Sequence, residues 1–189
     1  MMLYYSLVGN TFLNQLDDIV CRASQNPKSD ARLFEAIVNA PFHDKIRATE
    51  MDLGIVVLLL VNRAAGTIDR IALSDTEQAA GAVKMSEKPF KEIRIPVGYK
   101  DNLIAEAIET GRPQYVSDWK FLFAPALGSH AARFNQAGGG IEFSAVYPLK
   151  ARGGGALIFS FYQIHANIGA EQYSLMEQYA ALVDKYLSA

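Results

Sequence analysis

Residues 102–118 have the sequence NLIAEAIETGRPQYVSD, and this stretch decides how the chain is interpreted. Its first part predicts a helix, because a polar residue, Asp101 or Asn102, can cap it and apolar side chains recur along one side. Gly111 and Pro113 then end the helix. A short extended segment follows, so the stretch predicts a helix, a tight turn and a strand in succession.

Apolar runs on both sides of this stretch predict the rest of a sheet of five to six strands. The predicted strands cover residues 55–61, 67–73, 91–97, 143–149 and 156–162. The first run is apolar throughout, which is typical of a strand buried on both faces. The third alternates, with Ile93, Ile95 and Val97 toward the core. The first two and the last two strands are each joined by a short turn, so the pairing is predicted to be mainly antiparallel.

Helical periodicity marks both ends of the chain. The predicted helices cover residues 12–23, a segment that begins at Ser29 or Asp30 and is interrupted at Pro41, residues 42–51, and residues 170–187. We expect the terminal helices to cover one face of the sheet. Residues 74–88 are predicted to be mostly loop. The long irregular segment 118–141 must then cross the other face, and a loop of that length is usually functional.

Composition excludes several classes of protein. The chain has 189 residues, of which 50% are hydrophobic, and a net charge of −2, which excludes a disordered chain. Its 18 basic and 20 acidic side chains give no positive field over the whole surface, so a generally basic nucleic-acid binder is not expected. Cys21 is the only cysteine, which excludes a disulfide or a multi-cysteine zinc site within one chain.

No segment is typical of export or of membrane insertion. The most apolar run, residues 54–61, is far shorter than the roughly 20 residues that span a bilayer. The N-terminus has neither a basic region nor a small-residue cleavage site. We therefore expect a cytoplasmic protein with no membrane partner.

Three patterns, taken in order, resemble a GAF domain. They are the helix, Thr-Gly turn, strand and aspartate of residues 102–118, the hairpin SAVYPL at 144–149 with GALIF at 155–159, and the amphipathic C-terminal segment. The resemblance covers about residues 30–187. It implies a GAF-like (profilin-like) α+β domain at residues 29–189, preceded by a helical extension, residues 1–28, that packs or dimerises.

The resemblance also implies a small-molecule pocket, roofed by residues 118–141. GAF domains bind cyclic nucleotides, tetrapyrroles, haem or other small metabolites, and many dimerise. No cysteine lies between Asp118 and Tyr147, so no covalent bilin is expected. The single cysteine also departs from the free methionine sulfoxide reductase branch of the family, which uses several, and the cyclic-nucleotide signature has no match. The ligand and any cofactor stay unassigned.

Residues 118–141 hold most of the candidate ligand contacts. The predicted contacts are Asp118, Trp119, Phe121, Phe123, His130, Arg133, Phe134 and Tyr147. Aromatic walls with few polar groups are typical of ligand pockets. Arg133 can pair with a carboxylate or phosphate, whereas His130 has no partner at metal-ligand spacing, so no metal or haem is expected. The alternatives are that the aromatic side chains simply fill the roof, that Arg133 is solvated, and that Asp118 only fixes the loop.

No catalytic motif is present. The glycine runs at 138–140 and 153–155 lack the spacing and the lysine of phosphate-binding loops. Cys21, among apolar helical neighbours, is more typical of a packed residue than of a nucleophile. We expect a non-catalytic sensor or regulatory domain that binds a small metabolite, pairs as a homodimer through its terminal helices, and acts on an effector protein in trans. The alternatives are a dimerisation module with a vestigial pocket and an enzyme without a recognisable motif.

Overall fold

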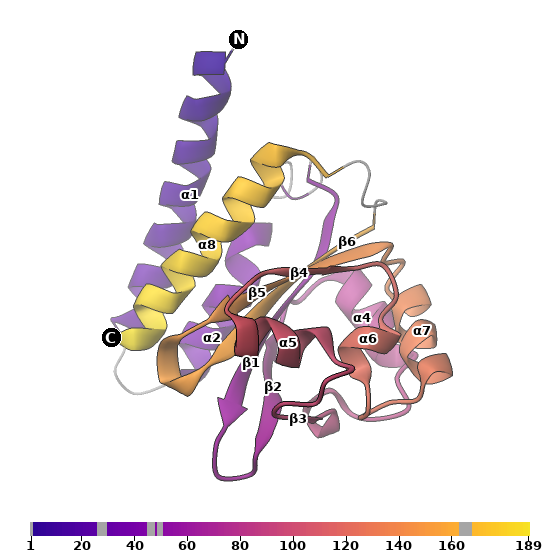
Figure 1. Ribbon diagram of the computed structural model, residues 1–189. Coiled ribbons are helices and arrows are strands. Elements are labelled where there is room, and N and C mark those ends of the chain that lie inside the picture. Colours follow the sequence, from indigo (N-terminus) through magenta and orange to yellow (C-terminus); the bar gives the residue numbers. More distant parts are fainter. Residues whose placement is uncertain (1, 26–29, 45–47, 49–50, 163–167) are drawn as a thin grey trace.

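Six strands form one antiparallel sheet, and helices cover both of its faces (Figure 1). The computed structural model describes residues 2–25, 30–44, 48, 51–162 and 168–189, with side chains from Thr11 onward. The strands are β1 Leu53–Asn62, β2 Thr67–Leu73, β3 Ile95–Pro96, β4 Gln114–Val116, β5 Phe143–Leu149 and β6 Gly155–Phe161. Their spatial order is β3-β2-β1-β6-β5-β4, and every neighbouring pair is antiparallel. The predicted fold class is confirmed.

The helices alternate with these strands along the chain. The α-helices are α1 Met2–Ser24, α2 Asp30–Asn39, α4 Glu77–Lys84, α5 Leu103–Thr110, α6 Lys120–Phe123, α7 Ser129–Gly138 and α8 Ala170–Ser188. Short 3-10 helices are η1 Ala40–Phe42, η2 Phe90–Glu92 and η3 Ala151–Gly153. Pro41 starts η1, as expected for a residue without a backbone N–H.

Strand β1 lies at the centre of the sheet because both of its faces are apolar. It pairs with β2 on one side and with β6 on the other. Val56 and Leu58 pack on one face, and Ile55, Val57 and Leu59 pack on the opposite face. The continuous apolar run therefore supplies two separate cores from a single strand.

Helices α1, α2 and α8, here called the helix layer, cover one face of the sheet (Figure 1). Their buried residues are Phe12, Leu16, Val20, Leu33, Ile37, Val38, Met176, Tyr179, Ala180, Val183 and Leu187. Tyr179 is fully buried, and its hydroxyl donates to the Ile37 carbonyl at 2.7 Å. The Tyr186 hydroxyl donates to Asp17 at 2.6 Å, which ties α8 to α1. The apolar stripe of α1 is thus packed within the chain.

Helices α4, α6 and α7, here called the roof, cover the opposite face, with α5 beside them. Asn102 joins α5 to α6. Its side-chain oxygen accepts from Ile104 N–H at 2.9 Å and Ala105 N–H at 3.1 Å, which caps α5 as predicted. Its amide donates to the Leu122 carbonyl at 3.0 Å and the Ala124 carbonyl at 2.8 Å. Trp119 lies on this face and Met176 on the other, as the predicted two-sided arrangement requires.

Three local predictions differ from the structure. The predicted strand 91–97 pairs only at Ile95–Pro96, since its first residues belong to the 3-10 helix η2, and Val97 is 50% exposed rather than in the core. The predicted loop 74–88 contains α4, which the Thr76 side chain caps. The predicted irregular segment 118–141 contains α6 and α7. Half of the predicted helix, residues 45–47 and 49–50 of 42–51, lies outside the described residues.

Candidate functional site

Two helices of the roof, α4 and α7, approach each other closely through glycines. A Cβ atom on Gly81 would overlap the carbonyl oxygen of Gly138. A Cβ atom on Gly138 would lie 2.7 Å from the Gly81 oxygen. The absence of side chains at both positions therefore lets the two helix backbones touch, and this contact fixes the spacing between α4 and α7.

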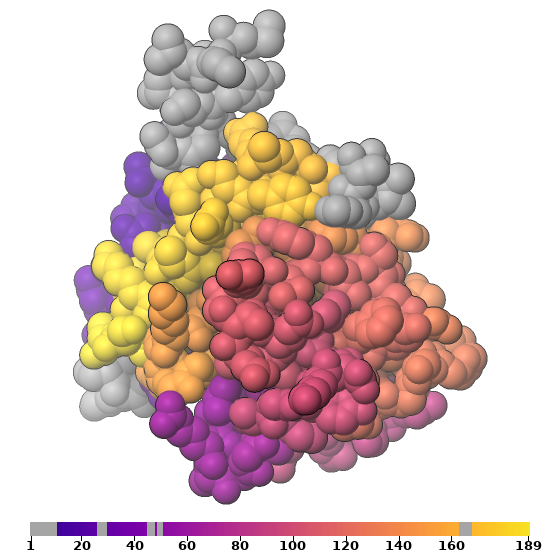
Figure 2. All heavy atoms as spheres, viewed as in Figure 1, coloured from indigo at the N-terminus to yellow at the C-terminus, as the bar shows by residue number. Residues whose placement is uncertain are grey.

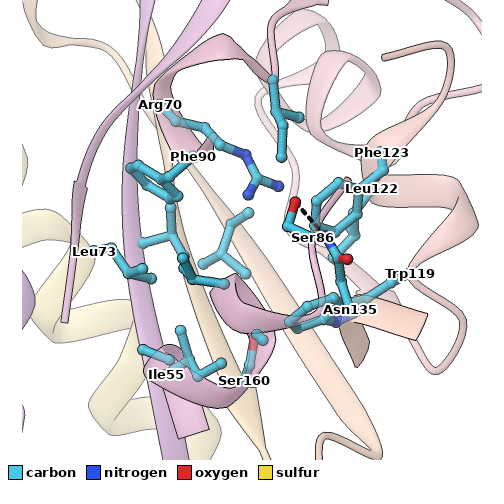
Figure 3. Close-up of a pocket in the computed structure, with 16 residues that line it drawn as sticks. Ile55, Arg70, Leu73, Ser86, Phe90, Trp119, Leu122, Phe123, Asn135 and Ser160 are labelled. Atoms are coloured by element: carbon cyan, nitrogen blue, oxygen red, sulfur yellow. Dashed lines mark hydrogen bonds between the residues drawn. The ribbon is translucent and has the colours of Figure 1, made fainter. Parts of the chain in front are cut away.

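A cavity lies between the roof and the sheet (Figure 3). Its volume is about 40 Å³, enough for a few waters or a small ligand. Its apolar lining consists of Ile55, Val57, Leu73, Ala79, Ala82, Val83, Phe90, Ile93, Trp119, Leu122, Phe123 and Ile158. Its polar lining consists of Arg70, Ser86, Asn135 and Ser160.

Arg70 faces this cavity because it alternates with the buried Ile68 on β2, and a bulge follows it. The register between β1 and β2 shifts after Arg70, so Ile71 is an extra residue without a partner across the ladder. Arg70 and Leu73 therefore both line the cavity, whereas Ala72 packs against the helix layer. Bulges that redirect a side chain in this way are frequent beside functional sites.

The guanidinium group of Arg70 is buried without an anionic partner. Arg70 is 9% exposed, and its Nε has no hydrogen-bond partner. No Asp or Glu among the described residues forms an ion pair with it. Its contacts are aromatic: its Cζ atom lies 4.2 Å from the Phe123 ring centroid and 5.4 Å from that of Phe90. Burial lowers the pKa of Arg70 to about 9, which leaves the group charged at neutral pH.

A chain of hydrogen bonds ends at the cavity wall on β6. The indole N–H of Trp119 donates to the Ser144 hydroxyl at 2.9 Å, and Ser144 lies 2.8 Å from the Ser160 hydroxyl. Because the indole can only donate, Ser144 accepts from it. If Ser144 then donates to Ser160, the Ser160 proton is left for an acceptor in the cavity. The opposite order would leave the spare proton on Ser144, which does not line the cavity.

Side-chain amides of α7 hold the roof in place. Asn135 is buried and hydrogen-bonds to the Ser86 hydroxyl at 3.2 Å (Figure 3). The Gln136 side-chain oxygen accepts from Trp119 N–H at 2.9 Å, and its amide donates to the carbonyls of Ser117 and Ile141, each at 2.9 Å. These bonds fix the position of Trp119 relative to the sheet.

Two of the predicted contacts, Trp119 and Phe123, line the cavity. Their rings lie side by side with centroids 5.4 Å apart. Both are nearly fully buried, at 6% and 3% exposure. They form one wall of the cavity, opposite β1 and β2 (Figure 3).

Asp118 and Arg133 pair with each other instead of facing the cavity. Arg133 donates to Asp118 through Nε at 3.1 Å and through a terminal nitrogen at 2.7 Å. The hydrogen bond from Arg133 lowers the pKa of the Asp118 carboxyl below its usual value. Asp118 also accepts from Lys120 N–H at 3.0 Å, which starts α6. Of the alternatives left open by the sequence, the loop-fixing role of Asp118 matches this geometry.

The other four predicted contacts also lie away from the cavity. Phe121 and Phe134 are 42% and 48% exposed, and His130 stacks on Phe134 with a centroid distance of 5.8 Å. Tyr147 packs against the helix layer, where its hydroxyl donates to the Tyr173 carbonyl at 3.3 Å. We therefore do not retain these residues as ligand contacts. The helical periodicity of α7 places Ala131, Ala132 and Asn135 inward and leaves the intervening residues outside.

The sequence analysis missed Arg70, Ser86, Asn135 and Ser160. One signal for Arg70 was available, because it alternates in register with the buried Ile68. A charged residue at an inward position of a strand is unusual and marks a candidate site. The serine and asparagine contacts have no comparable local signal.

Within the described ranges, no cluster of three or more His, Cys, Asp or Glu side chains could hold a metal ion. Over the same residues, no helix is long and apolar enough to cross a membrane.

Comparison of the sequence with protein-family models gives no match, and comparison with curated proteins gives none either. Solved structures match in fold. The GAF domain of a phosphoenolpyruvate-protein phosphotransferase from Acinetobacter has a TM-score of 0.62 at 12% identity, covering 95% of this chain and 93% of that one. The corresponding GAF domain from Coxiella burnetii has a TM-score of 0.62 at 15% identity, covering 95% and 94%.

An enzyme shares the same fold. A free methionine-R-sulfoxide reductase from Neisseria meningitidis, in complex with its substrate, has a TM-score of 0.58 at 13% identity, covering 95% of this chain and 91% of that one. The fold of this chain is therefore GAF-like, as the sequence patterns predicted. At such low identity the likeness concerns the fold alone.

Proposed function

We propose that this GAF-like chain is a non-catalytic sensor domain that binds a small metabolite in the cavity between roof and sheet. One observation carries the proposal: a partly open, mostly apolar cavity with a charged side chain, Arg70, directed into it and without an ion-pair partner among the described residues. Ligand pockets combine apolar walls with a few convergent polar groups in this way. The binding of small metabolites implied by the GAF resemblance agrees with this arrangement.

Signal transmission is proposed to run through the central strands. Val57 of β1 and Ile158 of β6 line the cavity, while their neighbours Leu58 and Leu157 pack against the helix layer. A ligand that binds one arrangement of the strands more tightly shifts the population toward it, and the helix layer follows. The effector that reads this change is proposed to be a separate protein, in the cytoplasm.

Pairing of two copies through the terminal helices is part of the proposal. Several apolar side chains of α1 and α8 pack against the core of the helix layer but stay partly exposed: Leu13, Ile19, Tyr173, Leu175, Leu182 and Tyr186. Figure 2 shows α8 along the visible surface, where a second copy could pack against it. Light scattering at tens of micromolar tests this part, and a particle of only 20.8 kDa would contradict it.

The absence of catalysis is supported by the position of the single cysteine. Cys21 lies on α1, in the helix layer, whereas the cavity lies on the opposite face of the sheet. A thiol there cannot reach a bound ligand without unfolding of the sheet. In addition, the chain has one cysteine, whereas the resemblance associates several with the reductase branch.

Thermal unfolding with a chemically broad set of neutral, cationic and anionic metabolites tests ligand binding. A ligand at 100 times its Kd should add about 2.7 kcal/mol to the free energy of unfolding. Ala82→Leu, which fills the cavity, should abolish the effect, whereas Ala80→Leu on the exposed side of α4 should keep it. If no compound of any charge stabilises the protein, and native mass spectrometry finds only the bare chain, the alternative of a dimerisation module with a vestigial pocket replaces this proposal.

A further inference from the structure

The cavity holds a positive charge that the protein itself does not neutralise. Buried charges in proteins are normally paired, because desolvation of an unpaired charge is costly. Arg70 has aromatic rings on its faces but no carboxylate and no hydrogen-bond acceptor for its Nε. The planar guanidinium fork matches a carboxylate, with which it forms two parallel hydrogen bonds.

We propose that the cavity binds a small organic monoanion, a carboxylate on a short hydrocarbon body, with Arg70 as its anchor. This inference rests on the proposed function and adds the chemical class of the ligand. Figure 3 shows the Arg70 guanidinium directed into the space enclosed by the lining side chains, with the aliphatic lining below it.

The polar groups of the cavity decide which atoms the ligand presents to them. Arg70 can only donate, and Ser160 also offers a proton to the cavity when Ser144 donates to it. The ligand must therefore bring acceptors. Figure 3 draws these two donors toward opposite ends of the lining, so the carboxylate meets Arg70 and the far end of the ligand lies near β6.

Charge counting limits the ligand to one negative charge and no positive charge. Arg70 is the only charged side chain that lines the described cavity. A phosphate dianion would bring a second negative charge that no lining residue neutralises. An α-ammonium group would find no carboxylate there, because the lining contains no Asp or Glu. Simple carboxylic acids are therefore favoured over both phosphate esters and α-amino acids.

Isovalerate, its neutral amide isovaleramide, and valine, which is isovalerate with an α-ammonium group, form a matched set of probes. Trp119 is the only tryptophan of the chain and lines the cavity, so its fluorescence reports on this site. We expect isovalerate to change Trp119 emission with a Kd about tenfold or more below those of isovaleramide and valine. The amide lacks the negative charge, and valine adds an ammonium group that finds no carboxylate in the lining. Sodium chloride at equal ionic strength is the reference.

Variants separate an anchoring role of Arg70 from a structural one. Arg70→Met should weaken isovalerate binding by about tenfold or more without affecting the weak binding of isovaleramide. Arg70→Lys keeps the charge but loses the planar guanidinium group. Its affinity for isovalerate should lie between those of the parent chain and Arg70→Met. Arg112→Met removes an exposed arginine outside the cavity and should bind like the parent chain. Circular dichroism and the unfolding midpoint confirm that each variant is folded.

Three results would overturn the inference. Equal affinity for isovalerate and isovaleramide, or unchanged isovalerate binding in folded Arg70→Met, shows that Arg70 does not select an anion. Absence of binding for acetate, isobutyrate and isovalerate at millimolar concentration also overturns it. If neutral or cationic compounds bind in the broad screen while these acids do not, the proposed sensor function survives and only the anionic ligand class fails.

Discussion

The helix layer and the roof pack on opposite faces of the same sheet, yet they bury different kinds of side chain. Between α1, α2, α8 and the sheet the buried side chains are aliphatic and aromatic, with the Tyr179 hydroxyl satisfied by a backbone carbonyl. Between the roof and the sheet lie Arg70, Asn135, Ser144 and Ser160, together with empty space.

This difference indicates a division of tasks between the two cores. A filled apolar core maximises the free energy gained from burial. A core that keeps a cavity and an unpartnered charge forgoes part of that free energy, and such local violations of good packing are expected at functional sites. The helix layer therefore stabilises the sheet, and the looser packing on the roof face agrees with the proposed ligand site there.

The largest expected effect is a difference between two residues of β1 that face opposite sides of the sheet. Leu58→Ala on the helix side should lower the free energy of unfolding by about 3–5 kcal/mol, since it opens a void in a filled core. Ile55→Ala, on the wall of the cavity, should cost only about 2 kcal/mol, because that side chain already borders empty space. Urea unfolding of both variants measures the difference. Equal losses would show that the roof core is packed as tightly as the other.

A second effect concerns the hydrogen-bond chain under the roof. Ser144→Ala leaves the Trp119 indole N–H without its acceptor, which should cost about 1–3 kcal/mol. Ser174→Ala, at an exposed position of α8, serves as the matched control. Urea unfolding and the Trp119 emission maximum should both change in the first variant. A free energy of unfolding equal to that of the control would mean that the hydrogen-bond chain contributes nothing to the stability of the roof core.

A third effect has the opposite sign. Without ligand, Arg70→Met should raise the free energy of unfolding by about 1 kcal/mol, because it removes an unpaired buried charge. The same substitution in a purely structural residue would lower stability through the lost aromatic contacts with Phe90 and Phe123. Thermal unfolding in ligand-free buffer distinguishes the two. A destabilised variant would place Arg70 among the packing residues.

The smallest effect belongs to the outer surface of the roof. The pKa of Asp118 is lowered by Arg133, so the carboxylate stabilises the folded protein above its unfolded pKa of about 3.8. This contribution is lost as the pH falls through the lower folded-state pKa. The stability difference between the parent chain and Arg133→Met should therefore be present at pH 6 and shrink below pH 3.8. A difference independent of pH would exclude the ion pair as its source.

Local sequence patterns predicted most of the fold. The apolar run of β1, the glycine turns of the hairpins and the capping of α5 by Asn102 are determined by near neighbours, and each was predicted correctly. The roof was predicted as a loop because α6 has a single turn and α7 is short and rich in alanine and polar residues. Such helices are stabilised by their packing against the sheet rather than by their own sequence.

The candidate site was predicted less completely than the fold. Trp119 and Phe123 were identified because aromatic residues are concentrated in their segment, but the same criterion included the exposed Phe121 and Phe134. Only the helical periodicity of the segment distinguishes the buried pair from the exposed pair. This periodicity cannot be applied to a segment that is interpreted as a loop. Arg70 shares the alternation of the buried Ile68, whereas the bulge that brings Leu73 to the same cavity is visible only when the register of two strands is known.

The contact between Gly81 and Gly138 sets a limit on what the cavity can admit. Where two helices are separated by side chains, their spacing can change by rotation of those side chains, but the touching backbones of α4 and α7 fix the spacing of these two helices. Any movement of one of these two helices must then be shared by the other. A ligand slightly too long for the cavity would have to displace both helices together. We therefore expect affinity to fall steeply with ligand length within a series of otherwise identical compounds.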